Sequence, residues 1–272
     1  MGYDISLTQG MRKNLISLQY TSTLLNMTQA RLSTGKKVNT AMDDPVNYFA
    51  AQSHMTRAAD LAARKDGMGE AINIVSSADK GISGIITLIE QAKGIATSAL
   101  ATTDSSSIAS YATQFDTVMS QILTLAKDAG YKGTNLLDNG SIDVKFNENG
   151  SSKLTVIGFG GTTLSTVSLA FSTTWGVSTA FINTSLSLIG TASEILRTKV
   201  KTLAANMNVI TTRQDFTKNM IDTLKTGADD LTLADMNEES ANMLMLQTRQ
   251  SLGTTSLSIA SQAAQSVLRL FQ

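Results

Sequence analysis

The sequence of 272 residues contains no cysteine and only one proline, one histidine and one tryptophan. Without cysteine, the chain has no disulfide, no thiol nucleophile and no cysteine-built zinc or iron–sulfur site. With His54 as its single histidine, it cannot supply a site that needs two histidines from one chain, such as a HExxH zinc site. We therefore expect a protein that is not an enzyme and binds no metal or cofactor.

Charge and hydropathy exclude two further classes of partner. The 22 basic side chains balance the 22 acidic ones, so no overall positive field attracts nucleic acid. Uninterrupted apolar runs are only a few residues long, far below the ~20 needed to span a bilayer. Balanced charge and dispersed lysines also disfavour a membrane-binding amphipathic helix. Residues 1–14 are polar, so we expect no Sec-type signal peptide there. Other export routes recognise different targeting signals.

The scarcity of proline favours very long helices, because proline is the residue that helices tolerate least. Apolar periodicity predicts helices over residues 46–100, 106–128 and 190–230. The two ends of the chain show a 4–3 spacing typical of coiled coils. In the first end it selects Asp4, Thr8, Met11, Leu15, Leu18, Ser22, Leu25, Gln29 and Leu32; in the last it selects Met236, Met243, Leu246, Gly253, Leu257, Ala260, Ala264, Val267 and Phe271.

The two ends also differ in charge. Residues 1–40 carry five basic side chains against Asp4, a net charge of +4, whereas residues 228–272 carry five acidic side chains against two arginines, a net charge of −3. Opposite charge and matching apolar stripes suit two helices that pack on each other. The alternative is that both are ordinary solvated faces. An apolar stripe that continues to Phe271 on an alanine-rich helix favours pairing, and it calls for a partner.

The middle of the chain changes its period. Residues 142–146 and 153–156 alternate apolar and polar side chains around Asn149-Gly150, a pattern that predicts a β-hairpin. Residues 158–185 are rich in glycine, serine and threonine, and we expect loops there with at most one short strand. Asp43-Asp44-Pro45 fits a helix N-cap followed by proline at the first helical position better than a carboxylate pair for Mg²⁺.

Several segments resemble one family. The stretch 31–44, RLSTGKKVNTAMDD, is similar to the segment that joins the first two helices of bacterial flagellins. The stretch 131–137, YKGTNLL, resembles the turn before the flagellin hairpin, and Arg213-Gln-Asp-Phe216 resembles an element of the returning helix. The stretches 234–243, ADMNEESANM, and 264–271, AQSVLRLF, resemble the start and end of the C-terminal helix. Their order and their distances from the two ends make the resemblance specific, over about residues 1–140 and 186–272.

The resemblance implies a mainly α fold with long antiparallel helices, a terminal coiled-coil pair and a small β-hairpin region. It divides the chain into four parts. Residues 1–42 and 231–272 form an inner-core coiled coil, residues 43–185 hold outer-core helices with a hairpin and loops over about 140–185, and residues 186–230 form the returning outer-core helix. Only about 45 residues separate the two flagellin-like halves, so the variable outer domains of longer flagellins are missing. The residues expected to pair or assemble are Met11, Leu15, Leu18, Leu25, Leu32, Met243, Leu246, Leu257, Val267 and Phe271.

By the same resemblance, the chain is a flagellin, the subunit that polymerises into the extracellular flagellar filament for swimming. Its partners are further copies of itself, an export chaperone, the filament cap and the hook-junction proteins, and export runs through the flagellar type III channel. The alternative is a hook–filament junction protein, which shares the terminal helices. A flagellin with a peptidase in its centre is disfavoured by the single histidine and the short centre.

One family feature is altered. In many flagellins an arginine-rich stretch of the outer-core helix binds the animal innate immune flagellin receptor. The corresponding stretch here is 88–98, LIEQAKGIATS, in which Lys93 aligns with one family arginine and Gln91 or Glu90 replaces the other. We expect recognition by that receptor to be weak or absent.

Overall fold

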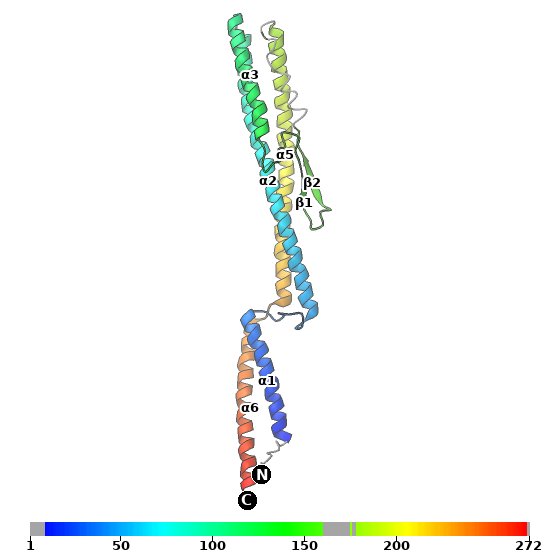
Figure 1. The fold of residues 1–272 in the computed structure, drawn as a ribbon, viewed down its shortest axis with the longest axis vertical. Helices are drawn as coiled ribbons and strands as arrows, with labels where there is room; N and C mark the ends of the chain where they lie inside the picture. Colours follow the sequence, from blue (N-terminus) through cyan, green and yellow to red (C-terminus); the bar gives the residue numbers. More distant parts are fainter. Residues whose placement is uncertain (1–8, 160–174, 176–177, 271–272) are drawn as a thin grey trace. The chain divides into compact units, whose positions relative to one another are not determined.

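The structure is a computed structural model that describes residues 9–159, 175 and 178–270, with the side chains of 267–270 left out. The described chain forms helices α1 (Gln9–Thr34), α2 (Pro45–Leu100), α3 (Ser105–Asp128), α5 (Thr179–Thr232) and α6 (Met236–Leu270), and strands β1 (Ser141–Lys145) and β2 (Lys153–Ile157) (Figure 1). This confirms the mainly α fold with a small hairpin. The helix α5 begins 11 residues earlier than the periodicity predicted.

The chain forms two compact units, 1–56 with 224–272 and 57–223. These bounds differ from the division at 42/43 and 230/231 expected above, which stays a prediction. The terminal unit contains α1, α6, the start of α2 and the end of α5. The central unit contains the rest of α2 and α5, together with α3 and the hairpin.

Local signals fix the ends of the helices. Pro45 opens α2, and Oδ1 of Asp44 accepts hydrogen bonds from the backbone N–H groups of Val46 and Asn47, each at 3.1 Å. Asp44 is therefore the N-cap that the sequence predicted. Asp104 caps α3 in the same way, accepting from the Ser107 N–H at 2.8 Å. Asp235 caps α6 through the N–H of Asn237, also at 2.8 Å.

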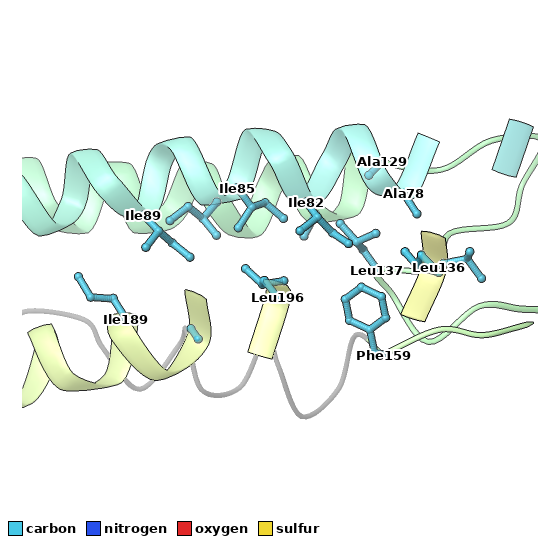
Figure 2. Packing of buried hydrophobic residues seen from close by; sticks show 14 of the residues in the cluster. Ala78, Ile82, Ile85, Ile89, Ala129, Leu136, Leu137, Phe159, Ile189 and Leu196 are labelled. Carbon is cyan, nitrogen blue, oxygen red and sulfur yellow. The ribbon is translucent and has the colours of Figure 1, made fainter. Parts of the chain in front are cut away.

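The core of the central unit lies between α2, α3 and α5. Ile82, Ile85 and Ile89 of α2 face Ile189 and Leu196 of α5 (Figure 2), and all five are almost fully buried. The α3 side chains Phe115, Met119 and Ile122 complete the cluster. Among the described helices, only α2 is long and apolar enough by length and composition to cross a membrane, with a window of mean hydropathy 1.2. Its buried face within this core accounts for that composition.

Glycine lets α2 and α3 approach closely. A Cβ added at Gly81 would lie 2.6 Å from the Cβ of Ala129, just beyond α3, and one at Gly84 would lie 2.9 Å from Cδ2 of Leu125. Any larger residue at these two positions would push the helices apart. Gly81 and Gly84 are therefore packing positions inside α2.

The hairpin forms around Asn149-Gly150, as the sequence predicted. Strands β1 and β2 are antiparallel, with Val144 opposite Leu154 and Ile142 opposite Val156. The turn residue Gly150 has φ +71°, a conformation that glycine adopts without strain. The tip docks on α2 and α5: Arg57 pairs with Glu148, Arg64 donates to the Glu148 carbonyl at 3.0 Å, and Arg213 lies 5.3 Å from the Phe146 ring centre. Side chains of α2 and α5, which are distant in sequence, thus stabilise a two-stranded hairpin that would be only marginally stable alone.

Candidate assembly surface

Helices α1 and α6 pack along each other and run in opposite directions in the terminal unit (Figure 1). Arg31 near the end of α1 pairs with Glu239 near the start of α6. Further along, Leu18 lies against Gly253, and the Asn14 amide donates to the Gly253 carbonyl at 3.3 Å. The predicted pairing of the basic and acidic ends is confirmed by these contacts.

The described residues that were expected in this interface fall into three groups. Met11 and Leu246 are buried, at 8% and 5% exposed. Half-buried positions are Leu18, Leu25, Leu32, Met243 and Leu257. Leu15 is 40% exposed, and at its level Asn14 reaches α6, so a place for Leu15 in the assembly stays a prediction. The side chain of Val267 and the whole of Phe271 lie outside the described residues.

Two threonines occupy seam positions that the sequence pattern gave to their neighbours. Thr21 and Thr28 are 2% and 6% exposed, where the 4–3 spacing selected Ser22 and Gln29. Thr21 satisfies its hydroxyl locally, by donating to the Ser17 carbonyl at 2.9 Å. A hydroxyl bonded to its own helix is buried at little cost. Sequence reasoning missed both positions because it sought large apolar side chains.

An ion pair between a buried glutamate and an arginine that is 34% exposed closes the seam at the connecting segments. Nη1 of Arg31 lies 2.9 Å from Oε1 of Glu239, whose side chain is only 9% exposed. Beside it, the backbone segments 35–38 and 232–234 exchange hydrogen bonds: the N–H of Lys37 donates to Thr232 at 2.8 Å, and the N–H of Ala234 donates to Gly35 at 3.0 Å. We call these backbone bonds the junction clamp. They join the end of α1 to the start of α6.

The pair also carries large apolar side chains that the described part of the chain leaves uncovered. On α1, besides Leu15, they include Ile16, Tyr20 and Met27, which are 64%, 64% and 44% exposed. At four and then seven residues apart, these three lie on one face, opposite the seam. On α6, Met236 and Leu244 are exposed, and so are Met245, Leu252 and Ile259, which are 51%, 67% and 62% exposed and are spaced seven apart. We call Ile16, Tyr20 and Met27, together with Met245, Leu252 and Ile259, the assembly stripes.

Sequence reasoning missed the assembly stripes. The seven-residue spacing of Met245, Leu252 and Ile259 is visible in the sequence. Each of them comes directly before a residue of the seam pattern, which has the same spacing. Exposed apolar patches of this kind mark interaction sites in soluble proteins. The arrangement therefore gives each terminal pair one internal seam and additional apolar faces for another molecule.

The connecting segment 35–44 is organised by its own side chains. Oδ2 of Asp43 accepts hydrogen bonds from the backbone N–H groups of Thr40 and Asn39, at 2.9 and 3.0 Å, and these bonds hold the pKa of Asp43 below its ordinary value. With Asp44 capping α2, both carboxylates have local partners. Among the described residues, no group of three or more histidine, cysteine, aspartate or glutamate side chains could hold a metal ion.

The receptor-type segment lies on the exposed face of α2 in the central unit. Glu90, Gln91 and Lys93 are all exposed, and Glu90 lies 3.9 Å from Arg197 of α5. Position 90 or 91, where the resemblance would place an arginine, thus carries a carboxylate or an amide on an accessible surface.

Two family models match the chain. Residues 6–141 match the bacterial flagellin N-terminal helical region, and residues 186–271 match the bacterial flagellin C-terminal helical region. The chain belongs to the flagellin family. Flagellin FljO of Caulobacter vibrioides is 30% identical over 98% of both chains, and a flagellin of Brucella melitensis is 30% identical over 95% of both. Flagellin FljK of Caulobacter vibrioides is 29% identical over 98% of both.

As a flagellin, the chain is a structural subunit of the bacterial flagellar filament, an extracellular polymer of copies of itself. The relatives match nearly end to end, which agrees with a short flagellin without large outer domains. Both family models and these relatives are flagellins, so the alternative of a hook–filament junction protein is not favoured.

Proposed function

We propose that the chain polymerises through its terminal helices, and that neighbouring copies cover the assembly stripes. The observation that carries this proposal is the exposure of six large apolar side chains on two helices that already bury a separate seam against each other. A contact between different faces of identical molecules generates an open helical filament when the rotation between neighbours does not close a ring. Residues 1–42 and 231–272 then form the inner core, and residues 43–185 and 186–230 form the outer core.

The proposal is tested by making the α6 stripe polar. Burying a large apolar side chain contributes about 1.5–3 kcal/mol, and 1.4 kcal/mol changes an equilibrium constant tenfold. The double variant Leu252→Gln with Ile259→Gln should therefore raise the critical concentration for polymerisation at least about a hundredfold. Sedimentation and negative-stain microscopy of purified protein measure this.

The matched control is Leu252→Met with Ile259→Leu, which keeps the apolar surface and should polymerise like the unaltered chain. Circular dichroism of both double variants checks that the helices of the central unit are intact. If the glutamine variant forms filaments at the normal critical concentration, the stripes are not the assembly surface.

The same proposal includes the route and the helpers of assembly. The chain leaves the cell through the flagellar type III channel, and it meets an export chaperone, the filament cap and hook-junction proteins on the way. It has no catalytic activity of its own. Co-purification of the chain with a tagged export chaperone tests the first of these partners.

We also propose that the innate immune flagellin receptor recognises this chain weakly. Gln91 lies exposed on α2 and offers an uncharged amide, and Glu90 beside it adds a negative charge. An amide lacks the charge and the rigid fork with which arginine binds carboxylates.

A further inference from the structure

The apolar seam of the terminal pair repeats itself and so does not define a single register. On α1, Met11, Leu18, Leu25 and Leu32 recur every seven residues, and Asn14, Thr21 and Thr28 recur with the same period. Facing them, α6 presents Leu246, Gly253 and Ala260, again seven apart. If α6 slipped by one heptad, about 10.5 Å, either Leu25 or Met11 would take the place of Leu18 against Gly253.

Such a slip preserves apolar contact almost everywhere along the seam. With Leu25 against Gly253, Leu18 faces Ala260 and Leu32 faces Leu246; with Met11 there, Leu18 faces Leu246. Hydrophobic burial is non-directional and scales with area, so it discriminates poorly between these registers. A feature that does not repeat must make the choice.

The ion pair between Arg31 and Glu239 is such a feature. In the slipped registers Glu239 would face either the level of Leu25 or the connecting segment beyond the last turn of α1. In both cases a side chain that is now 9% exposed would lose its partner at 2.9 Å. A buried charge without its partner is strongly destabilising, and setting register is the best-attested use of buried polar groups in coiled coils.

The selected register has a consequence for the outer faces of the pair. Because Leu18 faces Gly253, Leu252 of the α6 stripe lies level with the α1 stripe between Ile16 and Tyr20. Because Arg31 faces Glu239, Met27 lies close to the level of Met245. The α1 stripe and the α6 stripe therefore lie at the same level along the helix pair. A slip of one heptad, about 10.5 Å, would displace the α6 stripe along the α1 stripe. The α1 stripe spans roughly 16 Å, so the displacement would exceed half of its length.

We infer that Arg31 and Glu239 are specificity-determining residues for assembly: their ion pair selects one register of α1 against α6. This register holds both assembly stripes at the same level for a second copy of the chain. The second part rests on the proposed function, whereas the choice of register is independent of it. The junction clamp is the competing determinant, because it too is lost on slipping, and the experiment separates the two.

The absence of cysteine makes the register directly measurable in the full-length chain. One cysteine at Leu246 of α6 is combined with one on α1: Leu25→Cys reports the observed register, and Leu18→Cys and Leu32→Cys report the two slipped ones. The purified proteins are oxidised under polymerising conditions, and non-reducing electrophoresis separates disulfides within one chain from those between copies. In the unaltered background we expect the 25–246 disulfide to exceed either slipped one at least about tenfold.

The ion pair is then replaced by apolar side chains, Arg31→Met with Glu239→Leu, and separately reversed as Arg31→Glu with Glu239→Arg. The apolar variant should yield a slipped disulfide at a level comparable to the 25–246 disulfide, and the reversed pair should restore the preference. Glu70→Gln, which removes the exposed 2.9 Å pair with Lys132 in the central unit, is the control and should change nothing.

An apolar variant that forms only the 25–246 disulfide would show that the junction clamp sets the register and would overturn the inference. Loss of all three disulfides would overturn it too, since the ion pair would then be needed for pairing itself. The stripe variant Leu252→Gln with Ile259→Gln should keep the 25–246 disulfide. If it also polymerises normally, the proposed assembly surface fails while the result on register stands.

Discussion

Gly253 of α6 lies directly against Leu18 of α1. A Cβ at position 253 would lie 2.6 Å from Cδ2 and 3.1 Å from Cγ of that leucine. The missing side chain allows the two helices to approach at this level, where the Asn14 amide also reaches the Gly253 carbonyl. Close approach of two helices at a glycine is therefore built into the middle of the terminal pair.

The first prediction follows from this contact. Gly253→Val should separate α1 from α6 and destabilise the pair by about 1–3 kcal/mol, as overpacking of a filled site does. We expect filaments that depolymerise at a lower temperature, measured by light scattering during heating. The control is Gly10→Ala in α1, where an added Cβ meets nothing within 4 Å. If Gly253→Val filaments are as heat-stable as those of the control, the close approach is not needed for assembly.

The second prediction concerns the end of α6. Deleting residues 255–272 removes Leu257, Ile259 and the second half of the helix that pairs with α1. Polymerisation should be abolished. The central unit should stay folded, because its core residues lie between Met68 and Ile210. Sedimentation measures the first effect and thermal unfolding by circular dichroism the second. Filaments formed by the shortened chain would contradict the role of the terminal pair.

The third prediction concerns the hairpin tip and acid. The ion pair with Arg57 holds the pKa of Glu148 below its ordinary value. A carboxyl whose pKa is lower in the folded chain adds stability above its unfolded pKa, about 4.3. That stability is lost as the pH falls through the lower folded value. Glu148→Gln should therefore destabilise hairpin docking at neutral pH, and the difference from the unaltered chain should shrink in acid.

Hydrogen exchange of the hairpin amides at several pH values measures this difference. Glu238→Gln is a suitable control, since Glu238 is exposed on α6 outside the central unit. A difference between Glu148→Gln and the unaltered chain that stays constant from neutral pH down to acid would contradict the ionic contribution of Glu148.

The fourth prediction tests the receptor-type segment. Reporter cells that carry the innate immune flagellin receptor should respond weakly to the unaltered chain. Gln91→Arg should increase the response, because it places an arginine on the exposed face of α2 at one of the two positions that the resemblance assigns to one. Arginine at Gln121, an exposed position of α3, is the matched control and should have no effect. Full activation by the unaltered chain would refute the proposal.

Much of the fold followed from local features of the sequence. One proline permitted long helices, Asp44-Pro45 set the start of α2, and Asn149-Gly150 set the hairpin turn. These features act within a few residues, through backbone conformation and capping, so they can be predicted without knowing the rest of the molecule. The family motifs are likewise stretches of consecutive residues.

The sequence by itself therefore determined the secondary structure, the family and the pairing of the two ends. Only the tertiary structure decided which residues fill the seam, where Asn14, Thr21 and Thr28 lie in place of Leu15, Ser22 and Gln29. It also decided that Glu239 is buried against Arg31 and that Leu252 and Ile259 remain uncovered. A heptad pattern shows that a helix has an apolar face. Which of several such faces the chain itself covers depends on the register between helices more than 200 residues apart in sequence.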